Sequence, residues 1–99
     1  MAVRRDNEEI TSAGTFVWTG QGNNDESANS IRSYRDLTVS NEGAGVATLT
    51  VSFGQGYQTL ASLASGDFDT YLIPGAIGVT VTATGDDVDV TLISHEKIT

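Results

Sequence analysis

In the stretch VATLTVSF (residues 46–53), apolar side chains recur at every second position, so that Ala47, Leu49, Val51 and Phe53 share one side of an extended chain. A period of two with one apolar side is typical of a half-buried strand in an antiparallel sheet. The glycines of Gly54-Gln55-Gly56 follow at once. They predict a tight hairpin turn into a second strand.

Further segments have the same alternation, or a β-branched and aromatic composition. These predicted strands are residues 15–19, 31–40, 57–60, 68–73, 77–84 and 88–93. Turn-forming residues separate the strands about every 8–12 residues, and no helical segment intervenes. The chain is therefore predicted to be all-β, an antiparallel β-sandwich of about seven short strands that is either jelly-roll-like or Ig-like. Consecutive hairpins are expected between residues 46 and 94, and a parallel α/β fold is excluded because there is no crossover helix.

The connections between these strands carry recognisable turn signals. Gly43 and Gly45 lie in a turn at residues 41–45 and are both able to adopt a positive φ. We expect residues 61–65 to form an irregular link and Pro74-Gly75 to form a corner. The last five residues are expected to be a short polar tail that contains His95.

The alternation also predicts which side chains are buried. In residues 31–40 the apolar side carries Leu37 and Val39, so Tyr34 falls on the opposite, outer side. A small domain depends on its few aromatic side chains for core volume. The predicted core consists of Phe16, Trp18, Leu37, Val39, Leu49, Val51, Phe53, Phe68, Val79, Val81, Val90 and Leu92.

Residues 1–14 have no periodicity of useful length and mix both signs of charge. We expect them to form an extended N-terminal arm, either frayed or ordered on a neighbouring molecule, in front of a single β-sandwich domain at residues 15–99. A secretory signal peptide does not fit, because no apolar stretch follows Arg4 and Arg5.

Composition excludes several classes of function. The 99 residues include 13 acidic and 5 basic side chains, which gives a net charge of -8. That charge disfavours nucleic acid and anionic membrane surfaces as partners, and no apolar run is long enough to span a bilayer. Without cysteine there is no disulfide framework and no thiolate chemistry.

No pattern of catalytic or metal-ligating residues stands out. The acidic residues close in sequence are Asp67 and Asp69, and then Asp86, Asp87 and Asp89. Paired carboxylates serve in glycoside hydrolysis and in calcium sites, but Asp in turns is more simply explained by hydrogen bonds to its own backbone. His95 stands alone, without a nucleophile motif for it to activate. We therefore expect no enzymatic activity, no cofactor and no metal.

The basic residues suggest a partner-binding surface. Four arginines lie within the first 36 residues, whereas residues 37–99 hold a single base against seven acids. Arginine is favoured at protein interfaces because its guanidinium forms bidentate contacts. The predicted partner-binding residues are Val3, Arg4, Arg5, Ile10, Arg32 and Arg35, although scattered surface arginines explain the pattern equally well.

The stretch from Leu37 to Ser52 (LTVSNEGAGVATLTVS), with Gly56, Leu60, Gly66, Phe68 and the strand at residues 77–84, resembles small β-sandwich accessory proteins of tailed-phage virions. The likeness covers about residues 36–94. It implies a capsid decoration or cement protein, without catalytic residues, that binds the outer shell and stabilises it at subunit junctions. The implied partners are the major capsid protein and neighbouring copies, with a homo-oligomer such as a trimer as one arrangement, and the implied location is the virion surface after synthesis in the host cytoplasm.

Two alternative functions remain open. One is a carbohydrate-binding or adhesion module, whose ligand would stack on exposed aromatic residues; the candidates are Trp18, Tyr34, Tyr57 and Tyr71. The other is a tail or neck subunit of the virion with the same fold, which the sequence cannot distinguish from a capsid protein.

Overall fold

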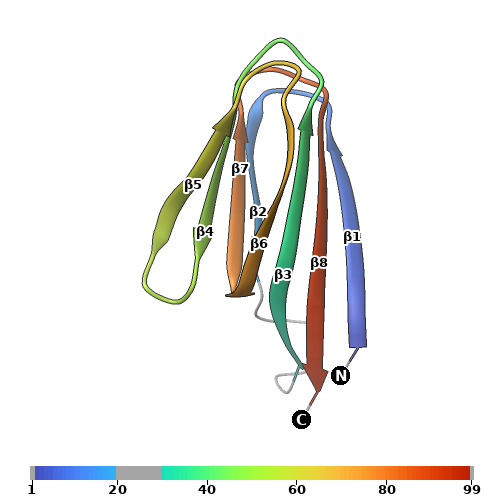
Figure 1. Ribbon diagram of the computed structural model, residues 1–99, viewed down its shortest axis with the longest axis vertical. Helices are drawn as coiled ribbons and strands as arrows, with labels where there is room; N and C mark the ends of the chain where they lie inside the picture. Colours follow the sequence, from blue (N-terminus) through green and yellow to red (C-terminus); the bar gives the residue numbers. More distant parts are fainter. Residues whose placement is uncertain (1, 20–29, 99) are drawn as a thin grey trace.

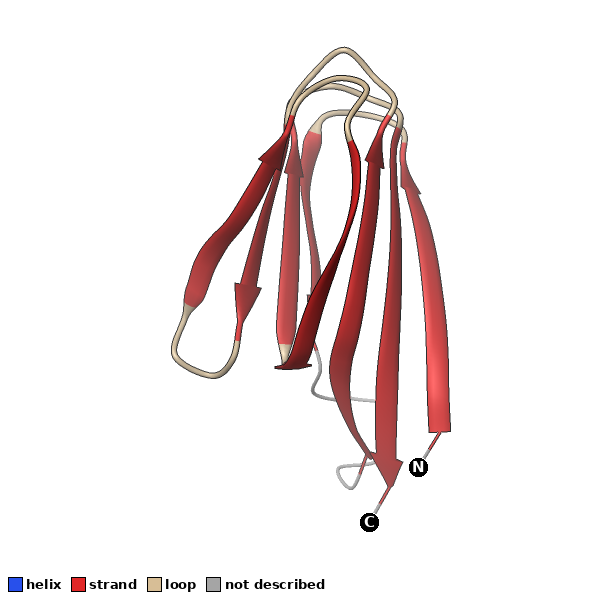
Figure 2. Cartoon of the chain, viewed as in Figure 1, coloured by secondary structure: helices blue, strands red, loops and turns tan. Residues whose placement is uncertain are grey.

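The computed structural model describes residues 2–19 and 30–98, and these form eight β-strands and no helix (Figures 1 and 2). All the pairings are antiparallel, and they make two four-stranded sheets. Sheet A contains, in spatial order, β1 (Ala2–Ile10), β8 (Val88–Ile98), β3 (Ser30–Asn41) and β6 (Phe68–Ala76). Sheet B contains β2 (Gly14–Thr19), β7 (Gly78–Ala83), β4 (Ala47–Ser52) and β5 (Tyr57–Leu63). The predicted antiparallel β-sandwich is confirmed.

The strand order identifies the jelly roll among the sandwich topologies. Most consecutive strands lie in different sheets, so most connections carry the chain across the sandwich. Only β4 and β5 follow one another as paired neighbours, around Gly54 and Gly56 with φ of 113° and 90°. The prediction of consecutive hairpins between residues 46 and 94 was therefore wrong. Two Greek keys wound into two sheets of this order define a jelly roll.

The N-terminal segment differs from the expected extended arm. Ala2–Ile10 is β1, an edge strand of sheet A that pairs with β8 from Ala2↔Glu96 to Ile10↔Val88. Its alternation is hidden in the sequence because Asp6 and Glu8 occupy the core-side positions opposite Leu92 and Val90. Inward-pointing charges are common on edge strands, where they discourage uncontrolled pairing.

The ends of three other strands also differ from their predicted positions. β5 continues to Leu63, through the link expected at residues 61–65, and β8 continues to Ile98, through the expected tail. β6 runs past Pro74 to Ala76, with Gly75 at φ 88° just before the chain crosses to sheet B. The corner predicted at Pro74-Gly75 is thus an irregular strand end.

A β-bulge reverses the predicted faces in the first half of β3. The pairing of β3 with both of its neighbours shifts register between Tyr34 and Asp36. The extra residue, Arg35, is exposed, while Tyr34 is buried with 2% of its surface accessible. Tyr34 had been placed outside by strict alternation, which a bulge breaks by one residue. Ile31, predicted on the inner side, has a side chain outside the described part of the structure.

The core lies between the two sheets and is mostly aliphatic. The predicted core residues that are buried are Leu37, Val39, Leu49, Val51, Val79, Val81, Val90 and Leu92, and Phe16 and Trp18 are half-buried against them. Two predicted core residues were wrong. Phe53 is 56% exposed because β4 ends at Ser52 and leaves it in the hairpin loop, and Phe68 is 67% exposed because it lies opposite Ser40 on the outer face of β6.

Candidate interaction surfaces

Among the residues that the structure describes, the outer face of sheet B has no charged residue. Its positions, read across the strands from β2 to β5, form three rows: Thr15, Thr82, Thr48 and Ser62; Val17, Thr80, Thr50 and Thr59; and Thr19, Gly78, Ser52 and Tyr57. We call this set the uncharged face. Its hydroxyls contact one another across strands, as between Thr15 and Thr82, whose Oγ1 atoms are 3.2 Å apart. On a chain with net charge -8, such a face is suited to contact with another macromolecule.

One end of the uncharged face is apolar. Phe53 in the β4–β5 hairpin, Tyr57 at the start of β5 and Ile77 before β7 are all exposed there. They are neighbours, since the Ile77 amide donates to the Ser52 carbonyl oxygen at 2.8 Å and Ser52 pairs with Tyr57. We call these three residues the apolar tip. Exposed aromatic groups beside an uncharged surface are typical of a protein-binding site.

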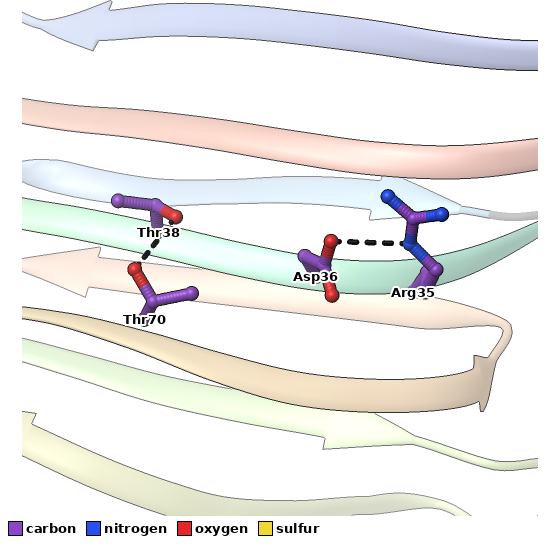
Figure 3. A network of polar contacts seen from close by, with 4 residues as sticks. All are labelled: Arg35, Asp36, Thr38 and Thr70. Atoms are coloured by element: carbon purple, nitrogen blue, oxygen red, sulfur yellow. Dashed lines mark hydrogen bonds and ion pairs between the residues drawn. The ribbon is translucent and has the colours of Figure 1, made fainter.

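The outer face of sheet A, in contrast, carries charges and internal polar contacts. Asn7 Nδ2 donates to the Asp89 carboxylate at 3.1 Å and to Thr91 Oγ1 at 2.8 Å. Figure 3 shows the paired hydroxyls of Thr38 and Thr70, 3.0 Å apart, and the 3.1 Å ion pair of Arg35 with Asp36. The two broad faces of the sandwich therefore have different chemistry.

Charge is also separated along the 43 Å long axis of the molecule. All five basic residues lie on sheet A near the beginning of β1, the first half of β3 and the end of β8: Arg4, Arg5, Arg32, Arg35 and Lys97. The opposite end, where loops join the two sheets, holds a cluster of acidic residues: Glu8, Glu9, Glu42, Asp67, Asp69, Asp86, Asp87 and Asp89. We call these the basic end and the acidic end.

The structure brings most of the predicted partner-binding residues to the basic end. Val3 and Arg5 are exposed on β1, and Arg35 is exposed at the bulge of β3. Arg4 and Arg32 occupy nearby strand positions, but their side chains lie outside the described part of the structure. Ile10 was wrongly predicted to bind a partner, because it is fully buried in the core.

The four aromatic residues considered for carbohydrate stacking do not share an exposed face. Tyr34 is in the core, where its hydroxyl donates to the Thr19 carbonyl oxygen at 3.0 Å. Trp18 and Tyr71 are half-buried against the core, and only Tyr57 is exposed on the uncharged face. The aromatic platform predicted for that alternative is not formed.

The acidic residues of the turns act locally. The Asp67 carboxylate accepts a hydrogen bond from the Ala64 amide at 3.0 Å, and Asp87 adopts a φ of 59° in the β7–β8 turn. Within residues 2–19 and 30–98, no three His, Cys, Asp or Glu side chains converge as metal ligands would. His95, predicted in a tail, is paired in β8, and its side chain is not among those described.

The environment of Tyr71 alters the titration of its phenol. It lies opposite Leu37 on the core side of the edge strand β6, two residues from Asp69 on the same side. Burial raises the pKa of the Tyr71 phenol above its usual 10.0, and the charge of Asp69 and a hydrogen bond to it raise this pKa further. Tyr71 and Asp69 thus interact on β6, an edge strand of sheet A.

Comparisons with known proteins bear on the fold alone. No family model matches the chain, and no curated protein matches its sequence. The chain is similar to the SPBc2 prophage-derived protein YomS, with 16% identity, a TM-score of 0.53 and 95% of each chain covered. It is also similar to a 3,4-ketoisomerase from Helicobacter canadensis, with 9% identity, a TM-score of 0.51, and 93% of this chain and 60% of that chain covered. A third similar structure is a pilus-forming Bacillus endospore appendage protein, with 13% identity, a TM-score of 0.49, and 97% of this chain and 88% of that chain covered. The first two likenesses agree with the two-sheet fold of this chain and show no more than that. Within the described residues, no helix is long and apolar enough to cross a membrane.

Sequence reasoning missed both the uncharged face and the charge separation within β1. A signal existed for each. Apart from Val17, hydroxyl residues fill the outer positions of residues 15–19, 48–52 and 80–82, and none of these positions is charged. In residues 4–9, arginines precede glutamates. Only the strand pairing shows that the first pattern forms one continuous surface.

Proposed function

We propose that this protein is a non-enzymatic structural protein of a phage virion, a capsid decoration protein that binds the outer shell at subunit junctions. The uncharged face and its apolar tip would contact the shell. The acidic end would remain in solvent. The major capsid protein would be the principal partner.

The observation that carries this proposal is the difference between the two faces of the sandwich. A solvated surface on so acidic a chain would be expected to carry charges throughout, and sheet A does. Sheet B instead presents hydroxyl groups, Val17 and the apolar tip, whose burial costs no charge desolvation. Repetition on a symmetric shell makes modest individual contacts sufficient for stable coverage.

The fold is compatible with this role, since the prophage-derived protein YomS shares it over 95% of both chains. Jelly rolls also occur in enzymes and lectins, so the fold does not distinguish among these functions. The half-buried Trp18 and the buried Tyr34 weaken the carbohydrate-binding alternative. The faces of the sandwich are therefore the better guide.

The first experiment asks whether the chain is part of the particle. Virions purified from the producing phage or induced prophage should contain the chain in many copies, detected by mass spectrometry and located on the shell by electron microscopy. A position on the tail or neck would favour the alternative virion subunit. Absence from purified particles would overturn any virion role.

The second experiment asks which face binds, using cosedimentation with shells that lack the protein. Thr50→Lys places a charge in the middle row of the uncharged face, and Thr38→Lys does the same at a similarly half-buried position on sheet A. We expect the first to reduce binding by on the order of tenfold or more and the second to leave it nearly unchanged. Phe53→Ser and Phe68→Ser form a second matched pair, with loss expected only for Phe53. Equal effects of both members of each pair would contradict the assignment of the face.

A further inference from the structure

The free edge of β1 is the longest regular strand edge of the sandwich. β1 is the terminal strand of sheet A, and no described strand lies on its second side. It pairs with β8 over Ala2–Ile10 without a register shift. A strand that is regular on its paired side presents an equally regular row of backbone amide and carbonyl groups on its free side.

The other edge strands are less suited to pairing. β5 is interrupted by a bulge, because its register shifts between Leu49 and Thr50 of β4 and leaves Leu60 as the extra residue. β6 has an irregular pairing with β3 and contains Pro74, which has no amide hydrogen. β2 is regular but has only 6 residues, against 9 in β1. A bulge, a proline and a short length are devices that prevent edge-to-edge association, and β1 has none of these three; the protective feature that it does carry is the pair of core-side charges Asp6 and Glu8.

The charges of β1 are ordered along the strand. Arg4 and Arg5 precede its central residue, Asp6, and Glu8 and Glu9 follow it. In an antiparallel pair of identical strands, the first half of each meets the second half of the other. The arginine half of one copy would therefore face the glutamate half of a second copy, while parallel pairing would set like charges side by side.

The symmetry of such a pair limits the register. A two-fold axis perpendicular to the sheet keeps the outer face of both copies on the same side. Residues directly opposite one another then point to the same face, so the axis must pass between one residue and its own copy. Near the middle of β1 that residue is either Asp6 or Asn7. Arg5 and Glu9 are both exposed on the outer face. In the Asn7-centred register Arg5 would lie directly opposite Glu9 of the second copy, but Asp6 would face Glu8. In the Asp6-centred register Arg4 would face Glu8 and Arg5 would lie diagonal to Glu9, with only Asp6 facing its own copy, so the charges favour this register.

We propose that two copies of this chain associate through antiparallel pairing of their β1 edges. Sheet A of one copy and sheet A of the other then form one continuous sheet of eight strands. The pairing also sets the basic end of each molecule beside the acidic end of the other, which offsets the repulsion between two chains of net charge -8. The proposal does not depend on the virion role, since it uses neither the uncharged face nor a shell.

Charge reversal on β1 tests the pairing, with oligomeric state measured by analytical ultracentrifugation and native mass spectrometry. Arg4→Glu with Arg5→Glu makes the strand uniformly acidic, and Glu8→Arg with Glu9→Arg makes it predominantly basic, with Asp6 as its one remaining acid. Each double variant alone should dimerise on the order of tenfold more weakly or not at all. Mixing the two should restore a dimer that contains one of each, and the quadruple variant, which exchanges the two halves, should dimerise by itself.

The matched control changes the same amount of charge away from β1. Glu42→Arg with Asp86→Arg replaces two exposed acids in loops at the acidic end, and it should weaken a β1-mediated dimer far less than either β1 double variant, because these loops lie off the paired strands. A wild-type chain that stays monomeric at millimolar concentration overturns the proposal. Dimers that persist in both β1 double variants, or double variants that do not recombine on mixing, also overturn it and place the contact elsewhere.

Single cysteines locate the contact, because the chain has no cysteine of its own. Under oxidation, Asp6→Cys or Asn7→Cys should form a disulfide between copies, according to which residue lies on the two-fold axis. Thr82→Cys, on the uncharged face, should not. Cross-linking at Thr82 without cross-linking at positions 6 and 7 contradicts the pairing. Shell binding measured in parallel separates a failure of this inference from a failure of the proposed function.

Discussion

Tyr57 covers Gly78 on the uncharged face, with no room between them for a side chain. The two residues pair with Ser52 from opposite sides, so the ring of Tyr57 extends across Ser52 to reach the backbone of Gly78. A Cβ atom built on Gly78 would overlap the Tyr57 hydroxyl oxygen and lie 3.0 Å from its Cζ atom. Glycine weakens a strand because it has no side chain to pack, and an aromatic ring from a neighbouring strand compensates for this. The same ring explains why Ser52 is buried on an outer face.

This relationship predicts that Gly78→Ala is destabilising only while Tyr57 is present. The new methyl group would displace the ring, so we expect the free energy of unfolding to fall by about 1–2 kcal/mol. In a Tyr57→Ser background the same change should cost little, because the space is vacant and alanine fits a strand better than glycine. Denaturant unfolding of the four proteins in this double-mutant cycle measures the coupling. Equal costs in both backgrounds would show that the ring does not pack on Gly78.

Gly43 is predicted to tolerate no larger residue. A Cβ atom there would overlap the backbone carbonyl oxygen of Asp86, because the β3–β4 loop crosses directly against the β7–β8 turn. Backbone cannot move aside as a side chain can, so Gly43→Ala should lower the free energy of unfolding by roughly 2–4 kcal/mol. Ala44→Ser, one residue further on and exposed, is the control and should change stability little. A Gly43→Ala variant as stable as that control would contradict the close approach.

Two buried polar side chains should respond in opposite ways to removal. Asn41 Nδ2 donates to the carbonyl oxygens of Gly45 and Leu63, at 2.8 Å and 3.0 Å, and so joins the ends of β3 and β5. Asn41→Ala leaves both carbonyl groups without this donor and should cost roughly 2–4 kcal/mol. The buried hydroxyl of Ser94 has no hydrogen-bond partner among the side chains and backbone groups that the structure describes. Ser94→Ala should therefore be neutral or stabilising by up to about 1 kcal/mol. Thermal and denaturant unfolding compare the two, and a clear loss of stability in Ser94→Ala would indicate a hydrogen bond to that hydroxyl.

The raised pKa of Tyr71 predicts how stability changes in alkaline solution. Between the usual value of 10.0 and the higher pKa of the folded state, the native phenol keeps its proton while the unfolded one loses it. Stability from this group is therefore complete below pH 10.0 and is lost as the pH rises through the folded pKa. Tyr71→Phe should reduce the alkaline fall in the unfolding free energy, which denaturant midpoints across that pH range would show.

The cause of the shift can be tested separately. Asp69→Asn removes the negative charge beside the phenol but leaves its burial unchanged, so the pKa of Tyr71 should fall towards 10.0 without reaching it. Phenolate absorbance during a pH titration measures this, with Tyr71→Phe used to identify the transition. A pKa that does not move in Asp69→Asn would assign the shift to burial and to the charge of Asp67.

Local alternation predicted the interior strands well. Residues 47–52, 78–83 and 88–92 each bury one face against the opposite sheet, and a buried face of period two is visible in a single sequence. The hairpin at Gly54-Gln55-Gly56 was likewise predictable, because the positive φ of its glycines is a local requirement. The low charge of the uncharged face was present in the same segments.

The alternation could not predict where bulges occur or which way the side chains of edge strands face. The extra residues Arg35 and Leu60 each shift the pattern by one position, so Tyr34 turns inward and both Leu60 and Ala61 pack on the core. Phe68 is apolar and lies in the edge strand β6, yet its side chain faces outward. The core side of β6 is occupied by the alternating positions that include Tyr71 and Ile73. Neither result follows from neighbours in the sequence.

The sequence by itself therefore determined the class of fold, since alternation and turn residues act over a few positions and need no knowledge of distant partners. Tertiary structure alone decided which sheet receives each strand, because long-range pairing such as Ala2 with Glu96 depends on the packing of the whole sandwich. It also decided that hydroxyl residues from four strands form one uncharged face and that the charges of β1 lie on an open edge. Both surfaces arise from the order of strands in space, which a local pattern does not contain.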